Sequence, residues 1–183
     1  MSRTIYYVAS TIDGFIADAE DKLDWLFQFN DVPGVGAHYE AFMKRIGAIA
    51  MGARTYEFLL NQSHEPWPYS GTPTWVFTHR NLPKIDGADL RFTTGPIEKV
   101  HAELIDAAKG KDVWLVGGGE LVAQFARVGL LDEVHLSLVP VTLGAGRPLL
   151  PANLRTPWKL DQITRFGEGM VELRYTLPAS SSQ

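Results

Sequence analysis

Apolar residues follow two spacings along the chain, one typical of strands and one typical of helices. Short apolar runs rich in β-branched and aromatic residues predict buried strands, whereas apolar residues three or four positions apart predict amphipathic helices. The predicted strands cover residues 5–9, 15–17, 48–51, 74–77, 90–92, 113–116 and 132–139. The predicted helices cover residues 35–46, 54–60, 96–109 and 121–128, and residues 160–166 and 170–177 predict a closing hairpin.

The order of these elements predicts the fold class. Strands alternate with helices through the middle of the chain, and strands alone follow at the end, so we expect an α/β fold with three layers. Its central mixed sheet has a parallel centre and an antiparallel C-terminal hairpin, and helices flank it. Residues 1–177 form one domain, residues 61–73 a loop, and the polar residues 178–183 a disordered tail. Gly47 is expected to end a helix, and Pro96 to lie in the first turn of another.

Composition narrows the range of partners. The 183 residues are 45% hydrophobic, enough for one sizeable core, and their formal net charge of −4 argues against a nucleic-acid partner. The chain contains no cysteine, which excludes disulfides and thiolate metal sites. No apolar run is long enough to span a membrane, and the first residues lead directly into a strand pattern without a signal peptide. We therefore expect a soluble, cytoplasmic protein that acts on a small molecule and has no membrane partner.

The most informative segment is residues 112–122, in which a buried strand ends in Gly117-Gly118-Gly119 and a helical pattern follows. Glycines allow close approach to backbone N–H groups, and a helix N-terminus offers unpaired donors and the positive end of a dipole. Phosphate is the ligand that suits such a surface. A tight turn without any ligand is the alternative interpretation.

Three other strand ends carry polar or small residues. They are Ala9-Ser10, Gly52-Ala53-Arg54-Thr55 and Thr78-His79-Arg80. Because ligands of open α/β sheets bind beyond the carboxyl ends of parallel strands, we expect these ends to form one groove for a dinucleotide with an extra phosphate. The alternatives are that both arginines are solvated surface residues, that both threonines are helix caps, and that the histidine only lines a loop.

Several motifs, taken in order, resemble those of a known superfamily. They are residues 9–17 (ASTIDGFIA), 51–57 (MGARTYE), 77–80 (FTHR), 116–120 (VGGGE), 130–134 (LLDEV) and 140–146 (PVTLGAG). The chain resembles the dihydrofolate reductase-like superfamily from residue 5 to residue 177, in particular the C-terminal reductase domain of the riboflavin-biosynthesis deaminase/reductase. Because the sequence has no cysteines for the zinc site of a deaminase, we expect a stand-alone reductase-like domain.

The resemblance implies NADPH as the cofactor. It implies that the backbone of Ala9 holds the nicotinamide carboxamide and that Ile16 packs against the ring. It also implies that the phosphates and the adenine end contact Gly52, Arg54, Thr55, Thr78, His79, Arg80, Val116, Gly117, Gly118, Gly119, Glu120 and Leu121.

Candidates for substrate binding are Asp13, Trp25, Tyr39 and Phe42, and no catalytic residue is identified. Each has a structural alternative: Asp13 belongs to an Asp-Gly turn, and the three aromatic residues suit core packing. The sequence has His38 or Tyr39 where folate reductases carry a carboxylate. It has Phe15 where the riboflavin enzymes usually carry a lysine.

The expected function is an NADPH-dependent reductase that transfers a hydride to a small pyrimidine-like or pterin-like heterocycle, similar to 5-amino-6-(5-phosphoribosylamino)uracil reductase. The alternatives are a non-catalytic NADP-binding protein and dihydrofolate reductase proper. In relatives the C-terminal strands make a two-fold contact, which implies a homodimer through residues 133–139 and the segment around 144–150.

Overall fold

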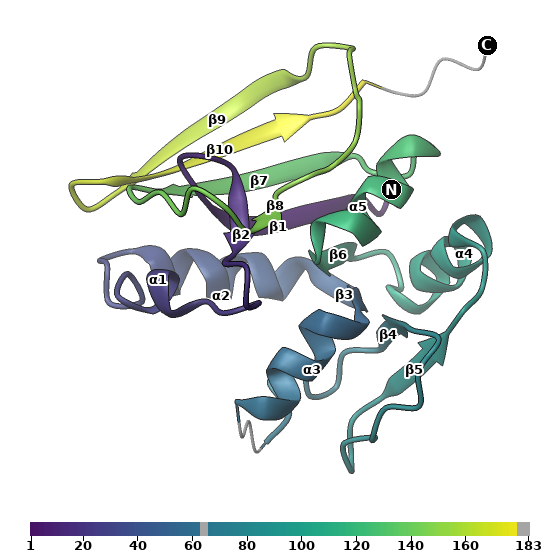
Figure 1. Ribbon diagram of the computed structural model, residues 1–183. Helices are drawn as coiled ribbons and strands as arrows, with labels where there is room; N and C mark the ends of the chain where they lie inside the picture. Colours follow the sequence, from purple (N-terminus) through teal and green to yellow (C-terminus); the bar gives the residue numbers. More distant parts are fainter. Residues whose placement is uncertain (63–65, 179–183) are drawn as a thin grey trace.

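The computed structural model describes residues 1–62 and 66–178, in which one large sheet carries helices on both faces (Figure 1). Its strands are β1 (Thr4–Thr11), β3 (Ile46–Gly52), β4 (Thr74–Phe77), β5 (Leu90–Thr93), β6 (Asp112–Gly117), β7 (Glu133–Val139), β9 (Lys159–Phe166) and β10 (Met170–Thr176). They lie in the order β5-β4-β3-β6-β1-β7-β10-β9. Strands β2 (Phe15–Ala17) and β8 (Arg147–Pro148) form a separate antiparallel pair.

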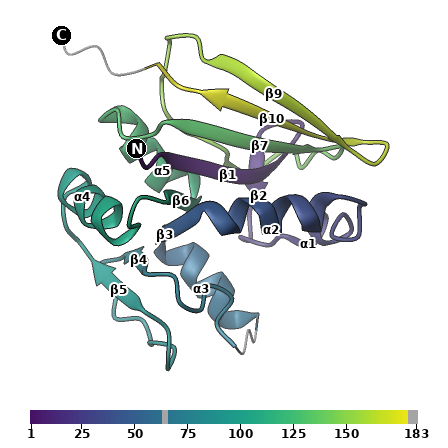
Figure 2. The ribbon, with the colours of Figure 1, turned by 180° about the vertical axis from the view of Figure 1, so that it is seen from behind.

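The predicted mixed sheet is confirmed. The six strands β5, β4, β3, β6, β1 and β7, in their order in the sheet, pair in parallel with their neighbours. Strand β10 pairs antiparallel with both β7 and β9. The helices are α1 (Asp24–Phe27), α2 (Val35–Arg45), α3 (Ala53–Asn61), α4 (Ile97–Ala107) and α5 (Gly119–Arg127). Apolar residues of α4 and α5 pack on one face, and those of α2 and α3 on the other, where α2 lies across the sheet (Figure 2). Within the described residues no helix is long and apolar enough to cross a membrane.

Some predicted boundaries were wrong, and packing explains the main error. Gly47 is not a helix stop that lies between two elements; it is the second residue of β3, and only glycine fits there because a Cβ would collide with the backbone of Ala108. Pro96 precedes the first turn of α4 as its N-cap rather than lying within that turn. Residues 63–65 of the predicted loop and residues 179–183 of the predicted tail lie outside the described residues.

One part of the core is charged. The Glu133 side chain is fully buried at the start of β7, where Arg3, Arg174 and His135 all bind its carboxylate. Burial lowers the pKa of His135 to about 4, so the imidazole is neutral at pH 7 and the two guanidinium groups balance the carboxylate. Glu172, on β10, is also buried and accepts a hydrogen bond from Nε2 of His38 at 2.9 Å.

Candidate functional site

A cavity of about 730 Å³ lies at the carboxyl ends of β1, β3 and β6, three neighbouring strands of the sheet. The antiparallel pair β2–β8 and the first turns of α3 and α5 also contribute to its wall. Figure 1 shows these elements near the ends of the three strands. Parallel strands that end at one edge of a sheet place their following loops together, and ligands of open α/β sheets bind at such an edge. The cavity is therefore the candidate functional site.

Two helices begin at this cavity with glycine as the N-cap. Gly52 precedes α3 and Gly118 precedes α5, and neither helix has a hydrogen bond from a capping side chain. A Cβ at Gly52 would lie 3.7 Å from the carbonyl oxygen of Gly117 and 3.8 Å from the nitrogen of Gly118, so a side chain would cover the glycine turn. Gly117 has a φ of 136°, which favours glycine. The bare backbone forms an open cradle suited to phosphate oxygens.

The third glycine of the turn has a different role. A Cβ at Gly119 would lie 2.5 Å from the carbonyl oxygens of Pro148 and Leu149. Because the backbone after β8 passes directly over the start of α5, only glycine fits there. Packing of the chain against itself is enough to require glycine at position 119.

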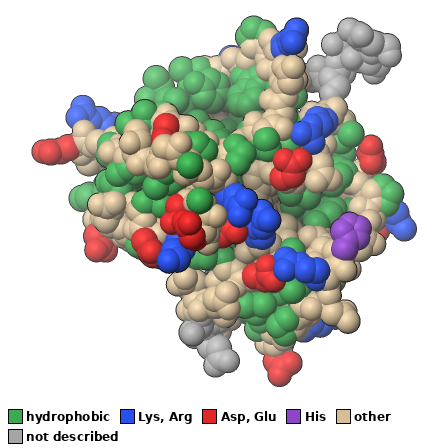
Figure 3. Space-filling view, in the orientation of Figure 1, with side chains coloured by type: hydrophobic (Ala, Val, Ile, Leu, Met, Phe, Trp, Pro, Cys, Tyr) green, Lys and Arg blue, Asp and Glu red, His purple; other side chains and the backbone are tan. Residues whose placement is uncertain are grey.

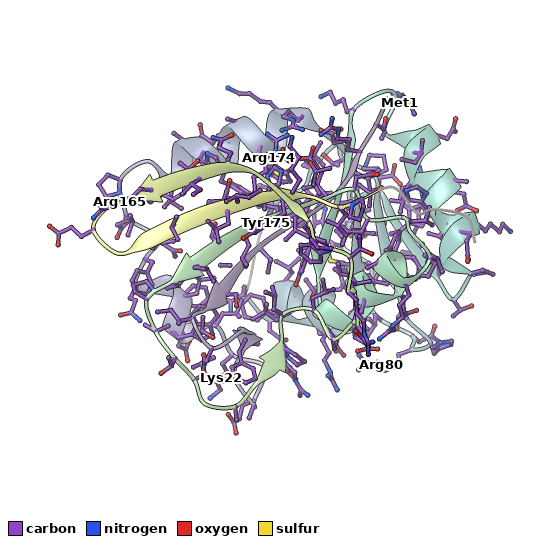
Figure 4. The ribbon with its side chains drawn as sticks, turned by 90° about the horizontal axis from the view of Figure 1, so that it is seen from above. Met1, Lys22, Arg80, Arg165, Arg174 and Tyr175 are labelled. Carbon is purple, nitrogen blue, oxygen red and sulfur yellow. The ribbon has the colours of Figure 1, made fainter. Side chains whose placement is uncertain are left out.

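Three arginines line the cavity, and carboxylates hold them in place. Arg80 forms two hydrogen bonds of 2.7 Å with Glu57. Asp21 binds Arg147 at 2.5 and 3.0 Å and lies 3.9 Å from Arg54. The hydrogen bond from Arg147 lowers the pKa of Asp21, and the charges of both arginines act in the same direction. Basic and acidic side chains accordingly gather in the middle of the face in Figure 3, and Arg80 lies on this side of the molecule (Figure 4).

The structure brings most of the predicted cofactor residues together around this cavity. Those that line it are Ala9, Ile16, Gly52, Arg54, Thr55, Arg80, Val116, Gly117, Gly118, Gly119, Glu120 and Leu121. Thr78 and His79 are not part of the wall. The hydroxyl of Thr78 accepts a hydrogen bond of 2.9 Å from the backbone nitrogen of Arg80, so it shapes the loop that carries this arginine, while His79 is exposed.

The four predicted substrate residues lie outside the cavity wall. Asp13 accepts hydrogen bonds from the hydroxyl of Thr11 and from the backbone of residues 143–144, as a turn residue does. Trp25 packs in a cluster that includes Ala9, and its buried indole N–H has no partner among the described residues. Phe42 is 4% exposed and belongs to the core, and Tyr39 packs beside it.

Several cavity residues were not predicted. Tyr7 lies two positions before Ala9 on the same face of β1, and Phe58 lies one helical turn after Arg54, so strand and helix periodicity contained a signal for both. Tyr69 and Arg147 come from irregular or very short segments, for which periodicity offers no signal.

Fold and cavity together define a dihydrofolate reductase-like α/β protein with its candidate site at the carboxyl ends of parallel strands. The chain belongs to the RibD C-terminal domain family, whose model matches residues 59–172. It is 29% identical over 174 residues to the Bacillus subtilis (strain 168) protein YwjB, covering 94% of this chain and 97% of that protein. It is 27% identical over 183 residues to YyaP of the same organism, covering 94% of each.

Solved structures agree with this family and fold. A putative riboflavin biosynthesis protein from Shewanella sp. PV-4 superposes with a TM-score of 0.79 at 26% identity, covering 95% of this chain and 98% of the other. Dihydrofolate reductase from Enterococcus faecalis, complexed with NADP(H), superposes with a TM-score of 0.66 at 16% identity, covering 95% of each chain. The second similarity concerns the fold alone.

Proposed function

We propose that this protein is an NADPH-dependent reductase that transfers a hydride to a small pyrimidine-like or pterin-like heterocycle. One observation carries the proposal: a single cavity combines two helix N-termini without a capping side chain, a bare glycine turn and three arginines. Membership of the RibD C-terminal domain family supports a reductase-like role. The complex of the Enterococcus faecalis enzyme with NADP(H) supports a nicotinamide cofactor in this fold.

The residues fit such a cofactor by charge and by shape. The backbone N–H groups at the starts of α3 and α5 would bind the diphosphate, because helix N-termini favour anions. Arg54 and Arg80 would bind the additional phosphate, since a guanidinium group pairs with phosphate oxygens as it does with Glu57 and Asp21 in the structure. Ala9 and Ile16 line the wall proposed for the nicotinamide. When bound, the reduced nicotinamide supplies the hydride.

We expect NADPH to bind at least about tenfold more tightly than NADH, because one charge-assisted contact to the extra phosphate contributes about 1.5–3 kcal/mol. The variant Arg80→Ala should lose most of this preference and leave the NADH affinity unchanged. Calorimetric titration of both dinucleotides measures the effect. Arg165→Ala is the matched control, because Arg165 lies at the far end of the β9–β10 hairpin (Figure 4). Equal affinity of the wild-type protein for both dinucleotides would contradict the proposal.

The alternative of a non-catalytic NADP-binding protein gives a different result in a second experiment. NADPH oxidation is followed by absorbance with a panel of pyrimidine and pterin acceptors. Oxidation that depends on an acceptor supports the reductase. Tight NADPH binding without turnover of any acceptor supports the nucleotide-binding alternative.

We also propose that two copies of the chain associate through the C-terminal strands. The strand expected to make the contact, residues 133–139, is β7, which lies between β1 and β10 and has no free edge. Strand β9 is the last strand of the sheet, and Ile163 on it is 63% exposed, so both unpaired backbone groups and apolar surface are available to a second copy. We expect sedimentation velocity to give twice the chain mass of 20.3 kDa. Ile163→Glu should produce monomers. The matched control is Ile12→Glu, at a 64% exposed residue directly after β1, and it should leave the association unchanged. A monomeric wild-type protein at micromolar concentration would contradict the association.

A further inference from the structure

Arg80 lines the cavity proposed for the cofactor, but a carboxylate of the protein already occupies its guanidinium group. Both terminal nitrogens of Arg80 donate hydrogen bonds of 2.7 Å, one to each carboxylate oxygen of Glu57. Arginine binds the oxygens of a phosphate group in the same two-pronged geometry. A phosphate that binds Arg80 in this way must therefore take the place of the Glu57 carboxylate.

The ion pair of Arg80 with Glu57 is not what holds α3 against the loop after β4. Tyr56 is fully buried on α3, and its hydroxyl donates a hydrogen bond of 2.7 Å to the carbonyl oxygen of Pro83 in that loop. The hydroxyl of Thr78 fixes the turn of the loop at Arg80. The side chains of Arg80 and Glu57 are 54% and 34% exposed, and such a surface pair contributes little to stability. Exchange of Glu57 for another anion therefore leaves both segments in place.

Arg54 needs no such exchange before it binds an anion. The carboxylate of Asp21 lies 3.9 Å from Arg54 and forms its hydrogen bonds, of 2.5 and 3.0 Å, with Arg147 instead. The side chain of Arg54 is also 67% exposed. Of the two arginines proposed for the extra phosphate, Arg80 is therefore the one whose binding competes with a carboxylate of the chain.

Glu57 lies at the boundary between two cavities. Arg80 lines the first cavity, whereas Glu57 lines a second cavity of about 660 Å³, which adjoins the first where they share Asp21 and Arg54. When a phosphate in the first cavity binds Arg80, the Glu57 carboxylate is left in the second. The charged groups around it there are the cations of Lys22 and Arg54 and the carboxylates of Glu20, Asp21 and Asp24. The released carboxylate thus stays among polar groups, and it can return to Arg80 when the phosphate leaves.

From this arrangement we infer that Glu57 is an internal competitor of the cofactor's extra phosphate and determines how strongly the protein prefers a dinucleotide that carries it. The inference rests on the proposed reductase function. A phosphate monoester carries about 1.5 to 2 negative charges at pH 7, more than a carboxylate, so it can displace Glu57 from Arg80. A dinucleotide without this phosphate leaves the ion pair intact. Glu57 therefore lowers the affinity for NADPH and does not affect the affinity for NADH.

The variant Glu57→Gln tests the inference, because it removes the charge and keeps the length of the side chain. We expect NADPH to bind about fivefold more tightly to this variant, which corresponds to the upper range for an exposed ion pair. The affinity for NADH should not change. Calorimetric titration of both dinucleotides measures the two affinities, and thermal unfolding shows that the fold is kept. If Glu57 instead orients Arg80 toward the phosphate, the variant binds NADPH more weakly. Weaker or unchanged NADPH binding overturns the inference.

Two further variants assign the effect to the ion pair. Asp89→Asn is the matched control, since Asp89 binds Arg91 at 3.2 Å in an exposed ion pair outside both cavities, and it should change neither affinity. In an Arg80→Ala background, Glu57→Gln should lose most of its fivefold gain, because the two residues act as one unit. A gain of the same size with and without Arg80 would show a general effect of charge and would overturn the inference.

The titrations of the wild-type protein separate this inference from the proposed function. If the wild-type protein prefers NADPH to NADH and Glu57→Gln does not raise the NADPH affinity, the cofactor site stands and the role of Glu57 is wrong. If the wild-type protein binds neither dinucleotide, the proposed reductase function itself fails, and the inference fails with it.

Discussion

Replacing Glu133 by alanine should lower the free energy of unfolding by about 3–5 kcal/mol, the range for breaking a buried ion pair from one side. The carboxylate is fully buried and lies 3.1 Å from Nη2 of Arg174 and 2.9 Å from Nε2 of His135. The Nε of Arg174 is already a buried donor without a described partner. Removing Glu133 therefore leaves the Arg174 guanidinium, whose side chain is only 27% exposed, without the carboxylate that it binds. Urea unfolding should show a lower midpoint with an unchanged slope.

A surface pair provides the matched control for this prediction. Asp89 binds Arg91 at 3.2 Å, but both side chains are about half exposed, so Asp89→Ala should cost at most about 1 kcal/mol. Glu133→Gln should fall between the two, since its amide oxygen still accepts a hydrogen bond but carries no charge. NADPH affinity should stay unchanged in folded Glu133→Ala protein, because Glu133 begins β7 and the cavity lies at the other ends of the strands. A loss no larger than that of Asp89→Ala would contradict the proposed cost of the buried charge.

The sequence predicted the elements of the fold well where side chains are either clearly inside or clearly outside. The central strands are continuous apolar runs, and β7 alternates, so periodicity identified both. It did not predict that β3 follows α2 without a break, because the position of Gly47 depends on the backbone of Ala108, about sixty residues later. Strand β8 was also missed, since two residues carry no periodicity and pair with β2 only in the folded chain.

In the candidate site, too, residues with a local sequence signal were predicted and residues placed by tertiary packing were not. Glycine turns and helix starts are local features, and the residues predicted from them line the cavity, as do Arg54 and Arg80. The prediction for the opposite end selected aromatic residues of α2, and the structure places Phe42 in the core. The aromatic residues that reach the cavity come from β1, α3 and the loop before β4. Which aromatic rings reach the cavity therefore depends on how these elements pack together in the folded chain, and local periodicity does not predict that.

Replacing Gly52 by valine should weaken NADPH binding about 10- to 100-fold and leave the fold intact. Gly52 has an extended backbone, with φ of −82° and ψ of 167°, which valine adopts readily. Its Cβ would meet the glycine turn at 3.7 Å, an ordinary contact, so the protein can accommodate it. The two methyl groups of valine would then cover the amides of residues 117–118 and keep a phosphate away from them, and losing a hydrogen bond to a charged group costs about 1.5–3 kcal/mol. Calorimetric titration of NADPH and thermal unfolding measure the two quantities separately.

Substitutions at two other glycines show whether the loss of NADPH binding depends on the position of the added side chain or only on its bulk. Gly36→Val, in α2 with no atom within 4 Å of the added Cβ, should leave NADPH binding unchanged. Gly119→Ala should destabilise the fold, because its Cβ would lie 2.5 Å from two backbone carbonyl oxygens that cannot move without the β8 segment. Loss of binding with a native unfolding curve at position 52, and loss of stability at position 119, together separate the ligand-facing glycine from the packing glycine. Full NADPH affinity in Gly52→Val would show that the dinucleotide does not lie across the glycine turn, because the methyl groups leave no room for a phosphate there.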